Sequence, residues 1–211
     1  MTVDFIRHIK DIAKQPPQLI IYVYHSWQEI FDAPFMREQV NYFLEDDKEL
    51  PGKVSTITSQ ADNKNSLLVL DDMISSQNMQ YFVNLFTVQA RHRKMSVIFL
   101  SQMMFSGGKT GDGLKGISHN ADYLILQKTK RNVKGVATLF QQISPFNWQT
   151  MLNIYQEATG LGTGLDVDEE EDSKNRYSYL LYDMTQSCPD HLKFRSHLFD
   201  EPGLVKVYVE N

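Results

Sequence analysis

The chain has 211 residues and a formal net charge of −5 at pH 7, with 42% apolar and 22% charged residues. These proportions are typical of a globular protein, and the negative charge excludes a protein that coats DNA through bulk positive charge. No apolar run approaches the roughly 18 residues of a membrane span, and the charged N-terminal stretch is unlike a secretory signal. Because Cys188 is the sole cysteine of the sequence, no internal disulfide can form.

The first part of the chain predicts a helix, a strand and a second helix. Apolar residues recur at helical spacing over residues 2–14, and the two prolines at 16–17 end that helix. The run LIIYVY (19–24) predicts a buried strand, and residues 34–44 have a helical pattern. Residues 45–65, which begin EDDKELPGKV, predict a polar, weakly ordered stretch and a loop.

The middle of the chain alternates strands with helical or loop segments. SLLVLDD (66–72) predicts a buried strand, and a helix is expected over about 76–91. SVIFLSQ (96–102) predicts a third strand. The glycine-rich SGGKTGDG (106–113) predicts a flexible loop, and ADYLILQ (121–127) predicts a fourth strand.

The last part of the chain predicts two helices and two terminal strands. The helices are expected at about 132–142 and 146–158. Residues 160–175 are glycine-rich and then acidic, which is typical of a solvated surface insertion. YSYLLYDM (177–184) and LVKVYVE (204–210) predict strands that form an added hairpin or edge.

The alternation of strands and helices predicts an α/β fold over residues 1–211, organised as a single domain. Its sheet should be mostly parallel and covered by helices on both faces. Ligands of such sheets bind at the carboxyl ends of the strands. The residues that follow each strand are therefore the first candidates for a functional site.

Two acids end the second predicted strand. A magnesium–nucleotide site needs a carboxylate at the end of a buried strand, so Asp71 is a candidate ligand of Mg²⁺ and Asp72 a candidate for polarising the attacking water. Two solvated acids at the end of a core strand are the alternative, and the short motif alone favours that alternative. Gln102 ends the next strand, where a polar side chain can contact the γ-phosphate or orient the water. Together the two strand ends point to one crevice.

Two basic segments are further candidates. ARHRK (90–94) lies between the acidic strand and the strand that ends at Gln102, and KTKRNVK (128–134) follows the fourth strand. Either segment could supply an arginine finger to the nucleotide of a neighbouring subunit, or could contact DNA phosphate. A solvated helix end is the third interpretation, and all three stay open.

The stretch GGKTG (107–111) resembles a phosphate-binding loop but does not fit the pattern. G-x-x-x-x-G-K-[ST] would need glycine at position 103, where the chain has Met103. The stretch also follows the strand of residues 96–102, which is the wrong strand for such a loop. The histidines and the cysteine show no metal-ligand spacing.

Taken in order, several segments resemble a known family. They are PPQLIIYVYHSWQEIFD (16–32), SLLVLDDM (66–73), ARHRKMSVIFLSQMMF (90–105), ISHNADYLILQKTKRN (117–132) and YSYLLYDMTQSCPDHLKFRSHLF (177–199). The chain resembles the DNA-packaging ATPases of double-stranded DNA viruses and Maverick/Polinton-type elements, in the FtsK–HerA superfamily of P-loop NTPases. The resemblance covers nearly the whole chain, and RHRKMSVIFLSQ is its most specific part.

The resemblance implies a P-loop ATPase that uses ATP and Mg²⁺ and forms a homo-oligomeric ring. Its partners would be double-stranded DNA and capsid proteins, with no membrane, and its location the host nucleus, a viral factory or the virion. Asp71 and Asp72 match the Walker B acids, and Gln102 matches the polar residue that ends the next strand. Arg93 and Arg131 match basic positions of the family, and which of them is the finger stays open.

The resemblance also implies a phosphate loop directly before the first helix, and that helix begins at about Met1. We therefore expect Met1 to be an internal methionine of a longer protein, or an upstream exon to precede it. As given, the chain should lack the first central strand and the Walker A loop, bind ATP poorly and hydrolyse little of it. A non-hydrolysing DNA- or capsid-binding scaffold subunit of the same fold is the alternative, and another FtsK–HerA-type motor, such as a helicase or conjugation pump, is a third.

Overall fold

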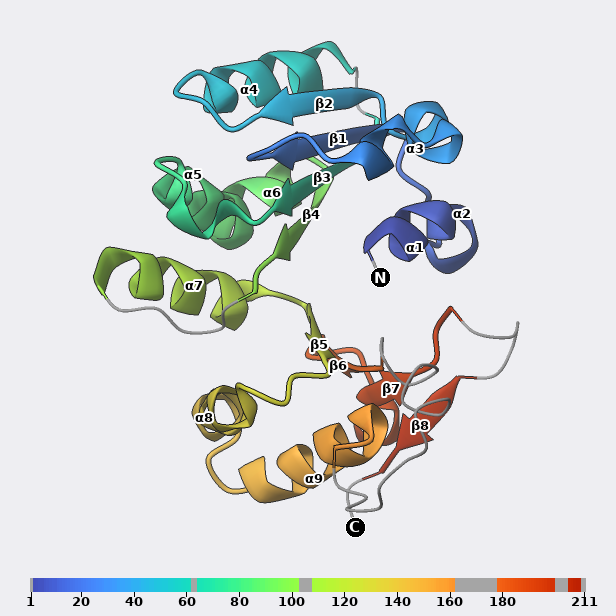
Figure 1. Cartoon of the computed structure of the whole chain (residues 1–211), viewed down its shortest axis with the longest axis vertical. Helices are drawn as coiled ribbons and strands as arrows, with labels where there is room; N and C mark the ends of the chain where they lie inside the picture. The colour runs from blue at the N-terminus through green and yellow to red at the C-terminus, as the bar shows by residue number, and fades with distance from the viewer. Residues whose placement is uncertain (1, 62–63, 103–107, 162–177, 200–204, 210–211) are drawn as a thin grey trace. The chain divides into compact units, whose positions relative to one another are not determined.

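The computed structural model forms two compact units, residues 1–120 and 121–211, each with a four-stranded sheet of its own (Figure 1). These units do not test the expectation that residues 1–211 form a single domain, which stays a prediction. The structure describes these parts of the chain: 2–61, 64–102, 108–161, 178–199 and 205–209. Within them, no helix is long and apolar enough to cross a membrane.

Unit 1 is built on a parallel sheet. In the order β2-β1-β3-β4, its strands are β2 (Tyr42–Glu45), β1 (Leu19–Tyr24), β3 (Ser66–Asp71) and β4 (Met95–Leu100). The central strands β1 and β3 are buried over five of their six residues, which explains why both read as continuous apolar runs. The predicted α/β fold with a mostly parallel sheet is confirmed.

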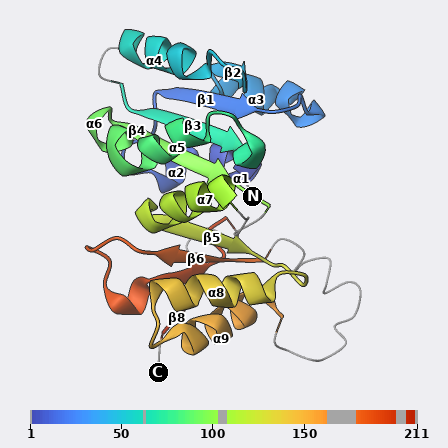
Figure 2. The ribbon, with the colours of Figure 1, turned by 90° about the vertical axis from the view of Figure 1, so that its left-hand side faces the viewer.

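Helices cover both faces of this sheet. One face packs against α1 (Thr2–Arg7), α2 (Ile9–Ile12) and α3 (Pro34–Gln39). The other packs against α4 (Leu50–Gln60) and α5 (Met79–Asn84). In Figure 2, α5 lies on the near side of the sheet and α1 and α2 lie behind it. The helix predicted over residues 2–14 is thus two short helices.

Two elements of unit 1 contradict the sequence-based expectations. The stretch expected to be weakly ordered contains helix α4, and the helix expected over 34–44 ends at Gln39 and is followed by strand β2. The helix was not predicted because α4 is rich in proline, glycine, serine and threonine, which favour loops over helices. Leu50 and Val54, spaced four residues apart, are nevertheless fully buried against the sheet and stabilise the helix.

The loop expected over 106–113 is also wrong from Gly108 onward, because helix α7 (Gly108–Asn120) begins there; residues 106–107 lie outside the described part. Two glycines lie where α7 packs closely on α5. A Cβ atom at Gly113 would lie 2.7 Å from Cγ of Met79, and one at Gly116 would lie 3.2 Å from Cγ1 of Val83. Tertiary packing therefore outweighs the poor helix propensity of glycine here.

The helix expected over 76–91 is present as three consecutive pieces. After α5 come a π-helical turn (Leu85–Gln89) and α6 (Ala90–His92). Thr87 Oγ1 donates to the carbonyl of Val83, four residues back, at 3.1 Å. The apolar side of this segment, including Phe82 and Leu85, packs into the core as the spacing predicts.

Unit 2 has an antiparallel sheet in the order β5-β6-β7-β8. Its strands are β5 (Tyr123–Gln127), β6 (Tyr179–Asp183), β7 (Phe194–Ser196) and β8 (Lys206–Tyr208). The fourth predicted strand is thus correct as a strand but wrong as a member of the parallel sheet. The terminal strands β6 and β8 do not form a hairpin together, because β7, which was not predicted, lies between them.

The two helices predicted for this unit are confirmed as α8 (Val133–Ile143) and α9 (Trp148–Thr159). They pack against each other, and α9 also packs against β6 (Figure 1). The Tyr155 hydroxyl donates to the carbonyl of Gln127 at 2.9 Å and accepts from the amide of Thr129 at 3.1 Å, which ties α9 to the end of β5. Gly160 ends α9 in the left-handed conformation, and most of the predicted insertion, 162–175, lies outside the described residues.

Candidate functional site

The carboxyl ends of β3 and β4 lie side by side at one edge of the parallel sheet. Asp71, the last residue of β3, is paired with Leu100, the last residue of β4. Asp72 and Ser101 follow directly, and Gln102 comes one residue later. The structure thus brings together the ends that carry Asp71, Asp72 and Gln102, at the edge where ligands of such sheets bind.

Asp71 is held from the neighbouring strand. The Tyr22 hydroxyl on β1 donates a hydrogen bond of 2.8 Å to Oδ2 of Asp71. The side-chain amide of Gln28, in the segment after β1, donates to the same oxygen at 3.5 Å. Within the described part of the chain, no hydrogen bond reaches Oδ1 of Asp71. One carboxylate oxygen is therefore held by the protein, and the other is available to a ligand.

Partial burial shapes the ionisation of this pair. Burial raises the pKa of Asp71, the hydrogen bond from Tyr22 acts against this rise, and the nearby Asp72 carboxylate adds to it. Burial also raises the pKa of the Tyr22 phenol, and the charge and hydrogen bond of Asp71 raise it further. Tyr22 is therefore a neutral donor at neutral pH, and the ionised form of Asp71 is less favourable than in water.

Asp72 has an unusual backbone conformation. Its φ of 55° and ψ of 41° lie in the left-handed region, which non-glycine residues rarely adopt and which aspartate tolerates better than most. A short 3₁₀ turn, Met73–Ser75, follows. The reversal of the chain leaves the Asp72 side chain exposed while the next residue, Met73, is fully buried. Such local strain is often found at functional sites.

A buried amide ties the loop after β3 to the end of β2. Asn78 Nδ2 donates to Oδ1 of Asp46 and to the carbonyl of Asp47, both at 2.8 Å. The Asp46 side chain is almost completely buried, and its Oδ2 lies 4.0 Å from Nδ1 of His25. These contacts connect the segment between Asp72 and α5 to a neighbouring strand end. They restrict the movement of the segment that carries Asp72.

The two candidate arginines belong to different units. Arg93 ends α6 and precedes β4, so it lies at the amino edge of the sheet, opposite to Asp71. Arg131 is exposed between β5 and α8, in unit 2. Within unit 1, Arg93 is therefore not brought to the acidic strand end. A finger acting on the nucleotide of a neighbouring subunit remains compatible with both positions.

The acidic strand end fits a magnesium ion that is shared with phosphates and water. Asp71 and Asp72 supply carboxylate oxygens, which are the protein ligands that Mg²⁺ prefers. In the described ranges no group of three or more His, Cys, Asp or Glu side chains is arranged to hold a metal. A cation here would therefore take most of its ligands from water and nucleotide phosphates, as is usual for Mg²⁺ in nucleotide sites.

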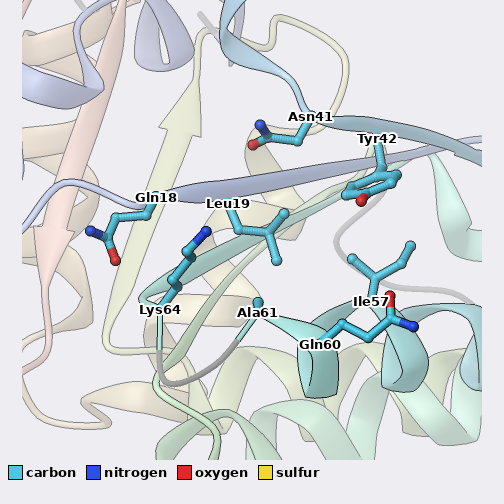
Figure 3. A pocket seen from close by; sticks show the side chains of 8 residues that line it. All are labelled: Gln18, Leu19, Asn41, Tyr42, Ile57, Gln60, Ala61 and Lys64. Carbon is cyan, nitrogen blue, oxygen red and sulfur yellow. The ribbon is translucent and has the colours of Figure 1, made fainter.

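A separate pocket of about 350 Å³ lies at the amino edge of the sheet, beside the end of α4 (Figure 3). Polar side chains of Gln18, Asn41, Gln60 and Lys64 surround it, together with the ring of Tyr42. Its place at the starts of β1 and β2 puts it at the opposite edge from Asp71. We therefore do not assign the nucleotide to this pocket.

Sequence reasoning missed Tyr22, Gln28 and Asn78. A signal for Tyr22 was present, since it is a polar-tipped residue inside the buried run LIIYVY. Such a hydroxyl needs a hydrogen-bond partner when it is buried. Gln28 and Asn78 lie in polar segments, where the sequence offers no comparable signal.

Residues 16–110 match the family model described as Poxvirus A32 protein. The match runs from just before β1 into α7, so it includes Asp71, Asp72 and Gln102 and covers slightly under half of the chain. It supports, at the level of the family, the resemblance to viral DNA-packaging ATPases. Comparisons with curated proteins and with solved structures gave no match.

Proposed function

We propose that this chain is part of an ATP-driven motor that packages double-stranded DNA into a viral or virus-like capsid. The observation that carries the proposal is the pairing of Asp71 with the end of β4, which brings two acids and Gln102 to one edge of a parallel sheet. The match of this same segment to the Poxvirus A32 protein family supports it. A motor of the Maverick/Polinton type is the finer form of the proposal.

Each residue at the strand ends has a separate task in the proposed reaction. Asp71 holds Mg²⁺ through Oδ1, directly or through water, as a Walker B acid. Asp72 polarises the water that attacks the γ-phosphate, and Gln102 contacts that phosphate or orients the water. The 211 residues contain no G-x-x-x-x-G-K-[ST] sequence, so the contacts that such a loop makes to the phosphates are not assigned to any residue of this chain.

The proposed partners are double-stranded DNA, capsid proteins and further copies of the chain in a homo-oligomeric ring. With a net charge of −5, contact with DNA has to be local, through a few basic residues of each copy. The segments 90–94 and 128–134 are the candidates for this contact. The place of action would be a viral factory or the virion, and the family match gives no support to the host nucleus.

ATP hydrolysis tests the proposal most simply. The protein should be expressed as its gene encodes it, with any upstream residues of the reading frame included. We expect hydrolysis that requires Mg²⁺ and rises with double-stranded DNA. Asp71→Ala should lose binding of Mg²⁺–ATP, whereas Asp72→Asn should keep binding and lose turnover. Normal turnover in Asp72→Asn would remove this residue from the mechanism.

Oligomers that mix two kinds of variant subunit can identify the arginine finger. We expect one of Arg93→Ala and Arg131→Ala to abolish turnover and to regain it when mixed with Asp72→Asn subunits, which keep their own arginine. Rescue occurs because a finger acts on the nucleotide of the next subunit. An arginine that contacts only DNA should show altered DNA stimulation without rescue. If neither variant is rescued, the finger is a different residue.

A non-hydrolysing scaffold subunit that binds DNA or capsid proteins is the second candidate. Such a subunit would contact DNA through the basic segments 90–94 and 128–134. The two candidates differ in one result. A scaffold binds its partners equally well in the wild type and in Asp72→Asn and shows no ATP hydrolysis in either, whereas a motor loses turnover in the variant.

A further inference from the structure

Two hydrogen-bond donors of unit 1 converge on a single oxygen of the acidic strand end. Both the Tyr22 hydroxyl, at 2.8 Å, and the Gln28 side-chain amide, at 3.5 Å, reach Oδ2 of Asp71. The two donors come from β1 and from the segment that follows it, so neither belongs to the strand that carries the carboxylate. The orientation of Asp71 is therefore set by a neighbouring element.

The stronger donor is buried and closely packed. Tyr22 is only 3% exposed, and its ring lies 5.0 Å from that of Phe31 and 6.0 Å from that of Phe43, measured between centroids. Its strand is paired on both sides, with β2 and with β3. Tyr22 is paired with Val69, two residues before Asp71, so the two side chains share one face of the sheet. A hydroxyl fixed in this way restricts the rotation of the carboxylate.

We propose that Tyr22 is a positioning residue for Asp71: its hydroxyl holds Oδ2 and so turns Oδ1 toward a divalent cation. The inference rests on the proposed function, because it takes Asp71 to be the cation ligand. Hydrogen bonds to the second oxygen of a ligating carboxylate orient the first, and loss of such a partner commonly costs 10- to 100-fold in metal affinity. Gln28 contributes less, since its hydrogen bond is long and exposed.

Binding of Mn²⁺ alone tests the proposal without any enzyme activity. Electron paramagnetic resonance counts free Mn²⁺ during a titration of the purified 211-residue chain, and Mn²⁺ is a close substitute for Mg²⁺ at oxygen ligands. The variants are Tyr22→Phe, Gln28→Ala and Asp71→Asn. Tyr24→Phe is the matched control, because Tyr24 lies on the same face of the same strand and packs on Trp27 and Phe31. In the described part of the chain its hydroxyl makes no hydrogen bond to Asp71.

We expect Tyr22→Phe to weaken Mn²⁺ binding by about 10-fold and Gln28→Ala by about twofold. Tyr24→Phe should bind as the wild type does, and Asp71→Asn should lose this site. Thermal unfolding without Mn²⁺ checks that each variant is folded at the titration temperature. In Tyr22→Phe the phenylalanine ring can make the same packing contacts as the tyrosine ring. Because Gln28 is exposed, Gln28→Ala should stay folded and can be measured even if Tyr22→Phe is less stable.

The outcomes separate the two proposals. If Tyr22→Phe binds like the wild type while Asp71→Asn does not bind, Tyr22 is only a buried tyrosine with a satisfied hydroxyl, and the positioning proposal is overturned. If the wild type and Asp71→Asn bind Mn²⁺ equally, or neither binds it, the cation assignment of the proposed function fails instead. A loss in Tyr24→Phe equal to that in Tyr22→Phe would also overturn the positioning proposal.

Discussion

Tyr22 and Asp71 are 49 residues apart in the chain, and a hydrogen bond of 2.8 Å joins them across two adjacent strands. The bond lies where the parallel sheet ends, so one partner is buried and the other faces the edge of the sheet. A carboxylate in this position is partly deprived of water without a cationic partner in the described residues. The position of the Asp71 carboxylate is therefore unfavourable for the stability of the protein, which suggests that it serves a function.

We predict that Asp71→Asn stabilises the protein at neutral pH when no divalent cation is present. Burial raises the pKa of Asp71, so the protonated carboxyl group favours folding below its unfolded-state pKa, and this contribution is lost as the pH rises through the folded-state value. Asparagine keeps an oxygen for the Tyr22 hydroxyl and carries no charge. Urea unfolding at pH 7 and at pH 4 measures the effect, which should be larger at pH 7. An Asp71→Asn variant less stable than the wild type at pH 7 would contradict it.

The left-handed backbone of Asp72 predicts different results for three substitutions. Asp72→Ala should destabilise the protein by about 1 kcal/mol, because a residue with an ordinary Cβ is strained at a φ of 55°. Asp72→Gly and Asp72→Asn should stay within about 0.5 kcal/mol of the wild type, since both residues adopt this conformation readily. Chemical denaturation measures all three. Equal stability of the alanine and glycine variants would show that the backbone carries no strain here.

Two glycines in helices predict opposite effects of the same substitution. Gly113→Ala should destabilise by about 1–3 kcal/mol, because its Cβ would lie 2.7 Å from Cγ of Met79 on α5. Gly52→Ala should stabilise by about 0.5–1 kcal/mol, because no atom lies within 4 Å of the added Cβ and alanine favours the helix. Urea unfolding compares them. A Gly113→Ala variant as stable as the wild type would show that the Met79 side chain moves aside without cost.

In unit 2, the side chain of Asp183 is nearly buried and pairs with Arg195. Although burial opposes it, hydrogen bonds from the hydroxyl and amide of Thr185 hold the pKa of Asp183 below its ordinary value. The stability from this group is therefore present above the unfolded-state pKa and lost as the pH falls through the folded-state value. We predict that Asp183→Asn costs about 3 kcal/mol at pH 7 and less below pH 3. A pH-independent loss would exclude the ionised carboxylate as its source.

Short stretches of sequence were enough to predict the buried strands of unit 1. The continuous apolar runs of β1 and β3 reflect burial on both faces, and the two acids Asp71 and Asp72 mark the end of β3 at the edge of the sheet. The direction and partner of β5 depend on β6, more than 50 residues later, so its run of apolar residues could not specify an antiparallel sheet.

The helices α4 and α7 could not be predicted for a different reason. Their glycine, proline and hydroxyl residues favour loops, and contacts with the rest of unit 1 stabilise them instead. The acids of the candidate site could be found from the sequence because they lie at the end of a recognisable strand. Tyr22 could not be assigned to Asp71, because only the pairing of β1 with β3 brings them together.

The acidic end of β3 should bind the divalent cation that accompanies ATP, and anomalous diffraction from a crystal of the protein grown with Mn²⁺ locates such an ion. We expect an anomalous peak about 2.0–2.5 Å from Oδ1 of Asp71, or about 4 Å away if a water intervenes, and no such peak in Asp71→Asn. A wild-type crystal with Mn²⁺ bound only elsewhere, such as beside Asp46 and Asp47, would show that Asp71 does not hold the cation.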